Sequence, residues 1–252
     1  MMRVRDEEET LEQSIRSLAE HLTIPYEIVL ILHLCTDRST QIATRLSTEF
    51  PTLRVLHYST PISRAGYETL ATDATSPHSL PTYYTWCHQQ CRLPWIFKWD
   101  GDFRASLGLI HFLNGRSWEE PVGEQFTIKI CAKNHDSNNI EPYLTSALSR
   151  YVKCWFWETP RYQYSYTTIV APTDAIIEHC SSLSVLKRYW SCPPWYETED
   201  SEEARIVKGR MARLIADFGQ EPVGLARASN PICDAICRRM MVAKPDYVNP
   251  TA

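Results

Sequence analysis

Two carboxylates, Asp100 and Asp102, end an apolar stretch that begins at Trp95. If this stretch is one extended strand, alternate side chains share a face, and the two carboxylates lie about 7 Å apart. Carboxylate oxygens suit hard divalent cations such as Mg²⁺ or Mn²⁺, and these ions keep open positions for substrate phosphates. The pattern predicts a cation site at the end of a buried strand. An acidic turn after a core strand is the alternative, so the surrounding elements matter.

The first half of the chain alternates strands and helices. We expect strands at 1–5, 26–34 and 53–58 and apolar-striped helices that begin near Asp6 and Thr36, two residues typical of helix N-termini. This alternation is typical of right-handed crossovers and a parallel sheet. A loop over 60–79 and a helix over 80–92 lead into the strand that ends in Asp100. The acids therefore lie at the carboxyl end of about the fourth strand, where such folds bind ligands.

The second half is less regular. Strands are expected at 126–132 and 152–157, with a helix over 142–151 between them. An acidic cluster follows the pair Pro193-Pro194; its members are Glu197, Glu199, Asp200, Glu202 and Glu203. A helix with an apolar stripe from Val207 to Phe218 comes next and should end at Gly219.

Composition limits the classes of function. The 252 residues are 44% apolar and carry a net charge of −4, which gives no electrostatic case for nucleic-acid binding. The nine cysteines show no C-x-x-C spacing, so we expect reduced thiols rather than a disulfide framework. No apolar run is long enough to span a bilayer, and no signal-peptide pattern begins the chain. The cytosol is the expected compartment, with peripheral attachment to a membrane as the alternative.

Several nucleotide and hydrolase motifs are missing from the sequence. With only eight glycines, the chain has no G-x-G-x-x-G, no G-x-x-x-x-G-K-[ST] and no G-x-S-x-G. Dinucleotide-binding, P-loop and α/β-hydrolase mechanisms are therefore not expected. What is left is a nucleotide-type sheet with an acid pair, in which a cation rather than a glycine-rich loop would neutralise a diphosphate.

Four stretches together resemble the inverting glycosyltransferases of family 2. They are Val4-Arg5-Asp6-Glu7-Glu8, Cys35-Thr36-Asp37-Arg38-Ser39, Asp100-Gly101-Asp102 and Glu199-Asp200. In that family they correspond to the opening Asn-Glu-Glu segment, the Ser-Thr-Asp-x-Thr segment, the D-x-D and the Glu-Asp pair. The resemblance covers residues 1–115 well and the rest thinly.

The resemblance implies a fold, an activity and a set of site residues. The fold would be GT-A, a single-domain α/β architecture with a Rossmann-type, mostly parallel sheet flanked by helices. The activity would be transfer of a hexosyl or deoxyhexosyl group, with inversion, from a nucleoside-diphosphate sugar to a hydroxyl of a glycan or another acceptor. The implied roles are Asp102 for Mn²⁺ or Mg²⁺, Glu7, Asp37, Arg64 and Asp100 for the donor, and Asp200 as general base.

Each role has an ordinary structural alternative. Glu7 and Asp200 could be simple first-turn acids, which favour helix N-termini electrostatically, and Arg64 could be a solvated surface residue. The family also has acids ahead of the Ser-Thr-Asp segment that contact the nucleobase. Here those positions read Leu32-His33-Leu34, of which His33 could still reach a base or a ribose.

The expected domain boundaries follow from the same resemblance. Residues 1–225 would form the glycosyltransferase domain, with a nucleotide-binding half over 1–115, an acceptor-binding half over 116–225 and a tail over 226–252. Two other functions stay open. One is a metal-dependent phosphohydrolase, and the other is a GT-A-like module that binds a sugar nucleotide without turnover.

Overall fold

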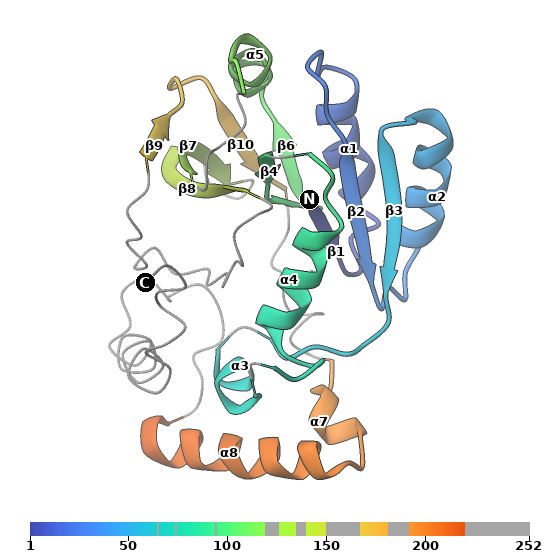
Figure 1. Ribbon diagram of the computed structural model, residues 1–252, viewed down its shortest axis with the longest axis vertical. Helices are drawn as coiled ribbons and strands as arrows, with labels where there is room; N and C mark the ends of the chain where they lie inside the picture. Colours follow the sequence, from blue (N-terminus) through green and yellow to red (C-terminus); the bar gives the residue numbers. More distant parts are fainter. Residues whose placement is uncertain are drawn as a thin grey trace. The chain divides into compact units, whose positions relative to one another are not determined.

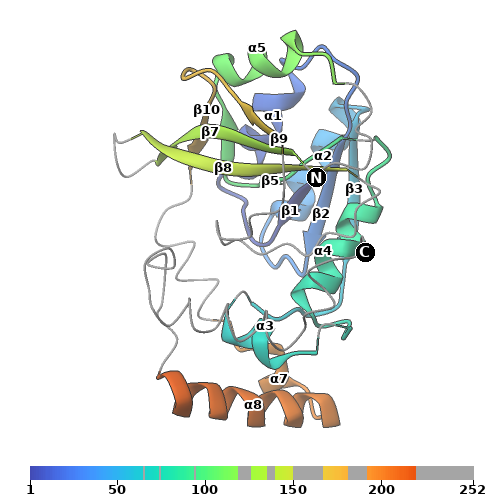
Figure 2. The same ribbon diagram turned by 60° about the vertical axis from the view of Figure 1, so that its left-hand side comes forward.

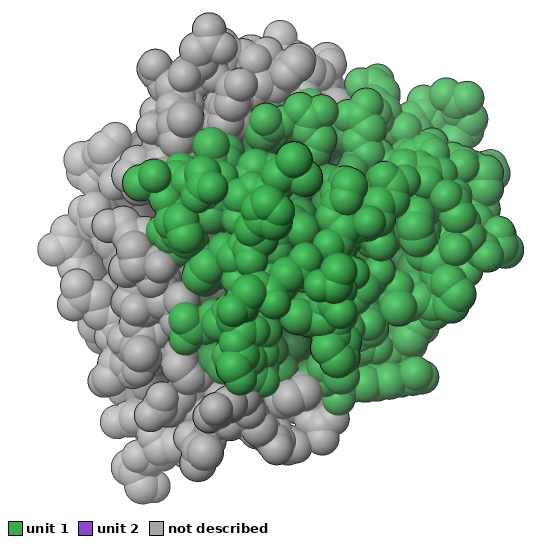
Figure 3. Space-filling model, turned by 90° about the horizontal axis from the view of Figure 1, so that it is seen from above, with its two compact units in different colours: residues 1–61, 84–156, 163–190 green, residues 62–83, 157–162, 191–252 purple. Residues whose placement is uncertain are grey.

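The computed structural model describes residues 1–64, 66–73, 75–93, 95–118, 126–134, 140–149, 167–180 and 192–219. The chain divides into two compact units, each described by itself. The first comprises Met1–Pro61, Tyr84–Phe156 and Gln163–Trp190, and Figure 3 shows one face of it in green. The second comprises Ile62–Tyr83, Trp157–Tyr162 and Ser191–Ala252. The boundaries expected at residues 115 and 225 stay predictions, and the tail over 226–252 lies outside the described residues.

The first unit contains a parallel four-stranded sheet, sheet A (Figure 1). Its strand order is β3-β2-β1-β5, with bounds Leu53–Tyr58, Ile28–His33, Met2–Val4 and Trp99–Asp100. The helices α1 (Leu11–Ala19), α2 (Ser39–Glu49) and α4 (Leu80–Gln89) connect or precede these strands. The expected fold class is confirmed: an α/β protein with a Rossmann-type parallel sheet flanked by helices.

Alternation along β1 explains how the sheet is covered on both faces. Met2 and Val4 are fully buried in one core with Leu11 and Ile15 of α1. Arg3 points to the opposite face, because successive side chains of a strand alternate. There its guanidinium lies 3.8 Å from the ring centroid of Tyr84 in α4. The central strand β2 is buried along its whole length, as expected for a parallel strand covered on both sides.

A second sheet, sheet B, completes the first unit (Figure 2). Its order is β4-β8-β7-β10-β6, and β9 also pairs with β7. The bounds are Trp95–Phe97 for β4, Phe103–Ala105 for β6, Phe126–Asn134 for β7, Ile140–Ser149 for β8, Thr167–Val170 for β9 and Ile176–His179 for β10. Helix α5 (Leu107–Gly115) follows β6 and is capped by the Ser106 hydroxyl, which accepts from the Leu109 amide.

Three expectations about local structure are wrong. Residues 142–151 were expected to be helical, but β8 covers 140–149 because it pairs with both β7 and β4, and strand pairing outweighs local propensity. The stretch 60–79 contains a short helix, α3 (Tyr67–Ala71). Helices α1 and α2 begin at Leu11 and Ser39 rather than near Asp6 and Thr36. The strand expected at 152–157 lies outside the described residues.

The second unit is built on helices. Helix α8 (Glu202–Phe218) ends at Gly219, as expected, where a φ of 80° suits glycine. It packs with α3 and with α7 (Trp195–Thr198) around a small core. That core contains Ala71, Trp195, Tyr196, Ala204 and Val207, with Met211 and Leu214 against it.

Two findings bear on the expected compartment. Cys35, Cys87, Cys91, Cys180 and Cys192 are not in disulfide bonds. Within the described ranges, none of the helices combines the length and the apolar character that a membrane crossing requires.

Candidate functional site

The acidic segment lies where the chain passes from sheet A to sheet B. Asp100 ends β5, Gly101 and Asp102 form a turn, and Phe103 begins β6. The assumption of one extended strand through Asp102 is therefore wrong, and the spacing of about 7 Å on one face does not follow from it. The strand is interrupted earlier as well, because Lys98 separates β4 of sheet B from β5 of sheet A. The turn lies at the carboxyl end of β5, where ligands bind in open α/β sheets.

Asp102 is paired with a histidine from another strand. The Nε2 atom of His179, the last residue of β10, lies 2.7 Å from the Asp102 Oδ2 atom. The pairing of β10 with β6 fixes this contact, because His179 is opposite Phe103 and the Cys180 amide donates to the Asp102 carbonyl at 2.7 Å. Burial lowers the pKa of His179, but the hydrogen bond to Asp102 and the charges of Asp102 and Asp100 outweigh it, so the pKa is raised.

Asp100 is held by two cations. Its Oδ1 atom lies 3.5 Å from the Arg3 Nη2 atom, and its Oδ2 atom lies 3.4 Å from the Lys98 Nζ atom. Lys98 is 5% exposed, and the ion pair accounts for a buried lysine at this position. Both carboxylate oxygens of Asp100 therefore face protein cations, whereas Asp102 faces an imidazole.

Glu7 is a buried carboxylic acid next to the turn. No described residue donates a hydrogen bond to its buried Oε2 atom. A Cβ atom on Gly101 would lie 2.7 Å from that oxygen, so only glycine allows the turn to approach Glu7 this closely. Burial raises the pKa of Glu7 well above its usual range, and the negative charges of Asp102 and Asp100 raise it further. This oxygen therefore lies against the acidic turn, with no donor among the described residues.

Asp37 stabilises the loops that follow β1 and β2. Its Oδ1 atom accepts from the Ser39 amide at 2.8 Å, and its Oδ2 atom accepts from the Glu8 amide at 2.8 Å. Asp37 also lies with Asp6 and Cys35 in a group whose potential ligand atoms are within 4.8 Å of one another. The Asp6 Oδ1 atom, however, already accepts from the Thr36 amide at 2.6 Å. These groups are therefore engaged in closing the loops, and Asp37 adds negative charge near Glu7.

The residues at the turn offer ligand types that a divalent cation accepts, although the described group whose potential ligand atoms all lie within 4.8 Å of one another is Asp6, Cys35 and Asp37. Asp102 offers a carboxylate, His179 an imidazole nitrogen and Glu7 a buried oxygen to which no described residue donates. Carboxylates suit Mg²⁺ and Mn²⁺, and imidazole is a ligand for first-row transition ions, which favours Mn²⁺. A cation would also offset the negative charges of Asp102 and Asp100, which raise the pKa of Glu7. Binding of a divalent cation by these residues stays a prediction.

Arg64, in the second unit, is paired rather than solvated. Its side chain is 15% exposed and forms an ion pair with Glu68, which is 4% exposed. The Arg64 amide also donates to the Glu68 Oε2 atom at 2.8 Å. The solvated alternative is wrong for Arg64, and its role in donor binding stays a prediction.

Asp200, also in the second unit, lies between the C-cap of α7 and the N-cap of α8. Glu199 is the C-cap of α7, and the Ser201 hydroxyl caps α8 by accepting from the Ala204 amide at 3.1 Å. The backbone of Asp200 is thereby fixed, while its side chain is exposed. This position is suitable for a general base, and the assignment stays a prediction.

His33 is buried and contacts the protein backbone. It is 4% exposed, and its Nε2 atom lies 3.0 Å from the Thr60 carbonyl. Burial and the charge of Arg5 lower its pKa to about 4, so the imidazole is neutral in the folded protein at neutral pH. The interpretation of His33 as a replacement for the family's base-contacting acids is not supported by this geometry.

The lowered pKa of His33 predicts that the folded protein becomes less stable in acid. The unfolded chain takes up the His33 proton near pH 6.5, whereas the folded protein resists it down to about pH 4. Stability should therefore fall by about 2 to 3 kcal/mol between these pH values through this residue alone. Urea unfolding of wild type and His33→Gln at several pH values measures this, and the variant should lose less stability on acidification. Parallel curves for the two proteins would contradict it.

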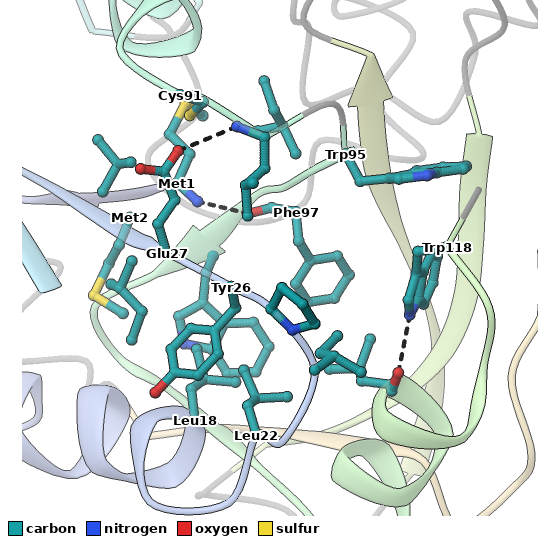
Figure 4. Close-up of a pocket in the computed structure, with 18 of the residues that line it drawn as sticks. Met1, Met2, Leu18, Leu22, Tyr26, Glu27, Cys91, Trp95, Phe97 and Trp118 are labelled. Atoms are coloured by element: carbon teal, nitrogen blue, oxygen red, sulfur yellow. Dashed lines mark hydrogen bonds between the residues drawn. The ribbon is translucent and has the colours of Figure 1, made fainter. Parts of the chain in front are cut away.

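A separate cavity of about 450 Å³ lies at the other end of sheet A, where β1 and β2 begin (Figure 4). Its walls are mainly apolar and include Tyr26, Trp95, Phe97 and Trp118. The Glu27 carboxylate at its edge is already paired with Arg54 at 2.7 Å. The charged side chains among the described lining residues are Glu27 and Arg116, and the Arg116 guanidinium carbon lies 5.4 Å from the Trp118 ring centroid. The described lining lacks a pair of carboxylates for a cation, so the turn at Asp102 is the better candidate site for a diphosphate with its metal.

The sequence missed His179, Arg3 and Lys98 as members of the site. The apolar residues that precede His179 in β10 could have indicated a strand that ends in a ligand, as for Asp100. Its partner strand could not be read from local pattern, because β10 pairs with β6 across more than seventy residues of chain.

Comparison with known proteins gives likenesses of fold. No protein-family model matches the chain, and no curated protein matches it. Among solved structures, TarS of S. aureus matches with a TM-score of 0.44 and 13% identity over 98% of this chain. This chain spans 52% of that structure. The mannosyltransferase PcManGT of Pyrobaculum calidifontis, solved with GDP-Man and Mn²⁺, matches with a TM-score of 0.45 and 11% identity over 96% of this chain and 79% of its own.

Proposed function

We propose that this chain is a metal-dependent inverting glycosyltransferase. It would move a hexosyl or deoxyhexosyl group from a nucleoside-diphosphate sugar to an acceptor hydroxyl in glycan synthesis. One observation carries the proposal: the turn at the carboxyl end of β5 brings Asp102 and His179 into contact beside the buried Glu7, which has an oxygen without a described donor. A nucleoside diphosphate with its cation is the ligand class that such a site suits.

The residues around the turn bind and orient the donor. A divalent cation held by Asp102 and His179, with Glu7 nearby, supplies the positive charge that stabilises the leaving diphosphate. For this, His179 must release the proton that it shares with Asp102. Arg3 and Lys98 hold Asp100 in place, which leaves this carboxylate able to accept from a ribose hydroxyl or from ordered water.

Asp200 would act on the acceptor. Its carboxylate takes the proton of the attacking hydroxyl while that oxygen forms a bond to the anomeric carbon of the sugar. The bond between the anomeric carbon and the diphosphate oxygen breaks in the same displacement, so the configuration inverts. General-base assistance of this kind contributes about 10²- to 10⁴-fold in rate.

A panel of ligands tests the proposal. Melting temperatures are measured with nucleoside diphosphates and with hexosyl and deoxyhexosyl nucleotide sugars, each with and without Mn²⁺. A ligand at 100 times its Kd should add about 2.7 kcal/mol of stability, and the gain should require the metal. The hit is then assayed with candidate acceptors, and proton NMR of the product should show the anomeric configuration opposite to that of the donor.

The same assays distinguish the alternatives. Phosphate release that no acceptor accelerates would instead indicate a phosphohydrolase. Metal-dependent binding without any transfer would indicate a sugar-nucleotide-binding module. Product with retained configuration would exclude the single-displacement mechanism.

A further inference from the structure

His78 is closely associated with the segment that carries Glu199 and Asp200. Its imidazole stacks on the indole of Trp195, with ring centroids 3.9 Å apart and an interplanar angle of 7°. Its Nε2 atom lies 3.6 Å from the Glu199 Oε2 atom. One histidine therefore contacts both the first residue of α7 and the C-cap residue that precedes Asp200.

The stacked pair is itself rigidly supported. Trp195 is 4% exposed, and its Nε1 atom donates to the Oγ atom of the fully buried Ser63 at 2.8 Å. The Ser63 amide in turn donates to the His78 carbonyl at 2.8 Å. The Ser63 hydroxyl also lies 2.6 Å from the Thr72 hydroxyl. Backbone and side-chain bonds thus connect the loop around His78 to α7 as one assembly within the second unit.

Glu199 is a more exposed member of this assembly than His78. Its side chain is 34% exposed, compared with 13% for His78. Glu199 is the point where the chain leaves α7, so its contact with His78 adds a side-chain restraint to the cap bonds on either side of Asp200. The imidazole can therefore set the direction in which the turn presents Asp200.

We propose that His78 is a positioning residue for the general base, acting through Glu199. The inference rests on the proposed transferase function and adds to it a residue that neither the D-x-D nor the acidic cluster includes. His78 does not take the acceptor proton. It holds the Glu199-Asp200 pair so that the Asp200 carboxylate meets the acceptor hydroxyl, and misplacement of a reacting group by about 1 Å can cost up to about a hundredfold in rate.

The variant His78→Phe removes the contact with Glu199. Phenylalanine keeps a flat ring for stacking on Trp195 but lacks the nitrogen that faces the carboxylate. We expect kcat to fall about tenfold, with the donor KM changed less than about twofold and the melting temperature unchanged. Glu199→Gln should give the same pattern. The double variant should be no slower than either single variant, because both remove one shared interaction.

Controls separate positioning from stability and from the proposed function. The same change at His111, which is exposed on α5, should leave kcat at the wild-type value. His78→Gln, which keeps a hydrogen-bond donor, should recover part of the loss. Wild-type kcat in His78→Phe, multiplicative losses in the double variant, or a loss that only accompanies a lower melting temperature would each overturn the inference. A wild-type protein that transfers no sugar to any acceptor would overturn the proposed function and this inference together.

Discussion

Asp102→Asn is expected to abolish the Mn²⁺-dependent stabilisation of the protein by a nucleoside diphosphate and to reduce sugar transfer by about 10²- to 10³-fold. The Asp102 carboxylate contacts His179 at the turn. Charge stabilisation by a bound metal amounts to several kcal/mol, and each 1.36 kcal/mol is tenfold in rate, which gives the expected range.

The free protein should change little. Asn still has an oxygen that can accept from the His179 Nε2 atom, so the free energy of unfolding should fall by no more than about 1 kcal/mol. Calorimetry with metal present measures the diphosphate affinity of both proteins. Equal affinities would contradict the assignment of Asp102 as the metal ligand.

Two further variants test whether the loss is specific to Asp102 and whether His179 takes part in metal binding. Asp174→Asn removes an exposed carboxylate from the same unit and should behave as wild type. His179→Gln should weaken metal affinity by about 10- to 100-fold if the imidazole is a ligand or orients one. A fully active His179→Gln would leave Asp102 without the partner that we assign to it.

The parallel sheet could be predicted because its signals are local. The third strand was expected at 53–58 and β3 covers Leu53–Tyr58, since a short apolar run between a helix stop and a loop admits few alternatives. Helix α8 and its end at Gly219 were equally clear from the apolar stripe. The helix expected over 142–151 failed because β8 is stabilised by pairing with β4 and β7, which no local pattern records.

The candidate site was predicted in composition but not in arrangement. Asp102 and Glu7 were named from the sequence, and the turn that carries Asp102 lies against Glu7, since a Cβ atom on Gly101 would lie 2.7 Å from the Glu7 Oε2 atom. The pairing of Asp100 with Arg3 and Lys98 depends on β1 lying beside β5, with Arg3 in register with Asp100. His179 depends on the register of β10 with β6. These partners are set by which strands pair and in what register, so they cannot be predicted from spacing along the chain.

The acids thus differ in what surrounds them. Asp100 faces two cations, Asp102 faces an imidazole, and Glu7 is buried with one oxygen that no described residue donates to. Burial raises the pKa of Glu7. The negative charges of Asp102 and Asp100 raise it further, because three ionised carboxylates near one turn would repel one another. Graded surroundings of this kind suit separate roles: a positioned carboxylate, a metal ligand and a buried acid whose charge depends on a bound cation.

Asp200→Asn is expected to keep the affinity for donor and Mn²⁺ near wild type while reducing turnover by about a hundredfold or more. The residue stands between Glu199 and Ser201, and the α8 residues that follow anchor it, since Ala204 and Val207 are almost fully buried. An exposed carboxylate on a fixed backbone can accept a proton from a bound hydroxyl, whereas the amide of Asn cannot. The binding residues of the first unit are untouched by the change, so the loss should appear in kcat.

The neighbouring acids provide matched controls for Asp200. Glu197 and Glu202 are exposed members of the same cluster, and Glu197→Gln and Glu202→Gln should be far milder than Asp200→Asn. Steady-state kinetics with saturating donor and varied acceptor measures all three. If Asp200→Asn transfers sugar at the wild-type rate while one neighbour is inactive, that neighbour is the base. If all three variants are active, the cluster only provides the solvated acids that favour a helix N-terminus, and the acceptor proton leaves by another route.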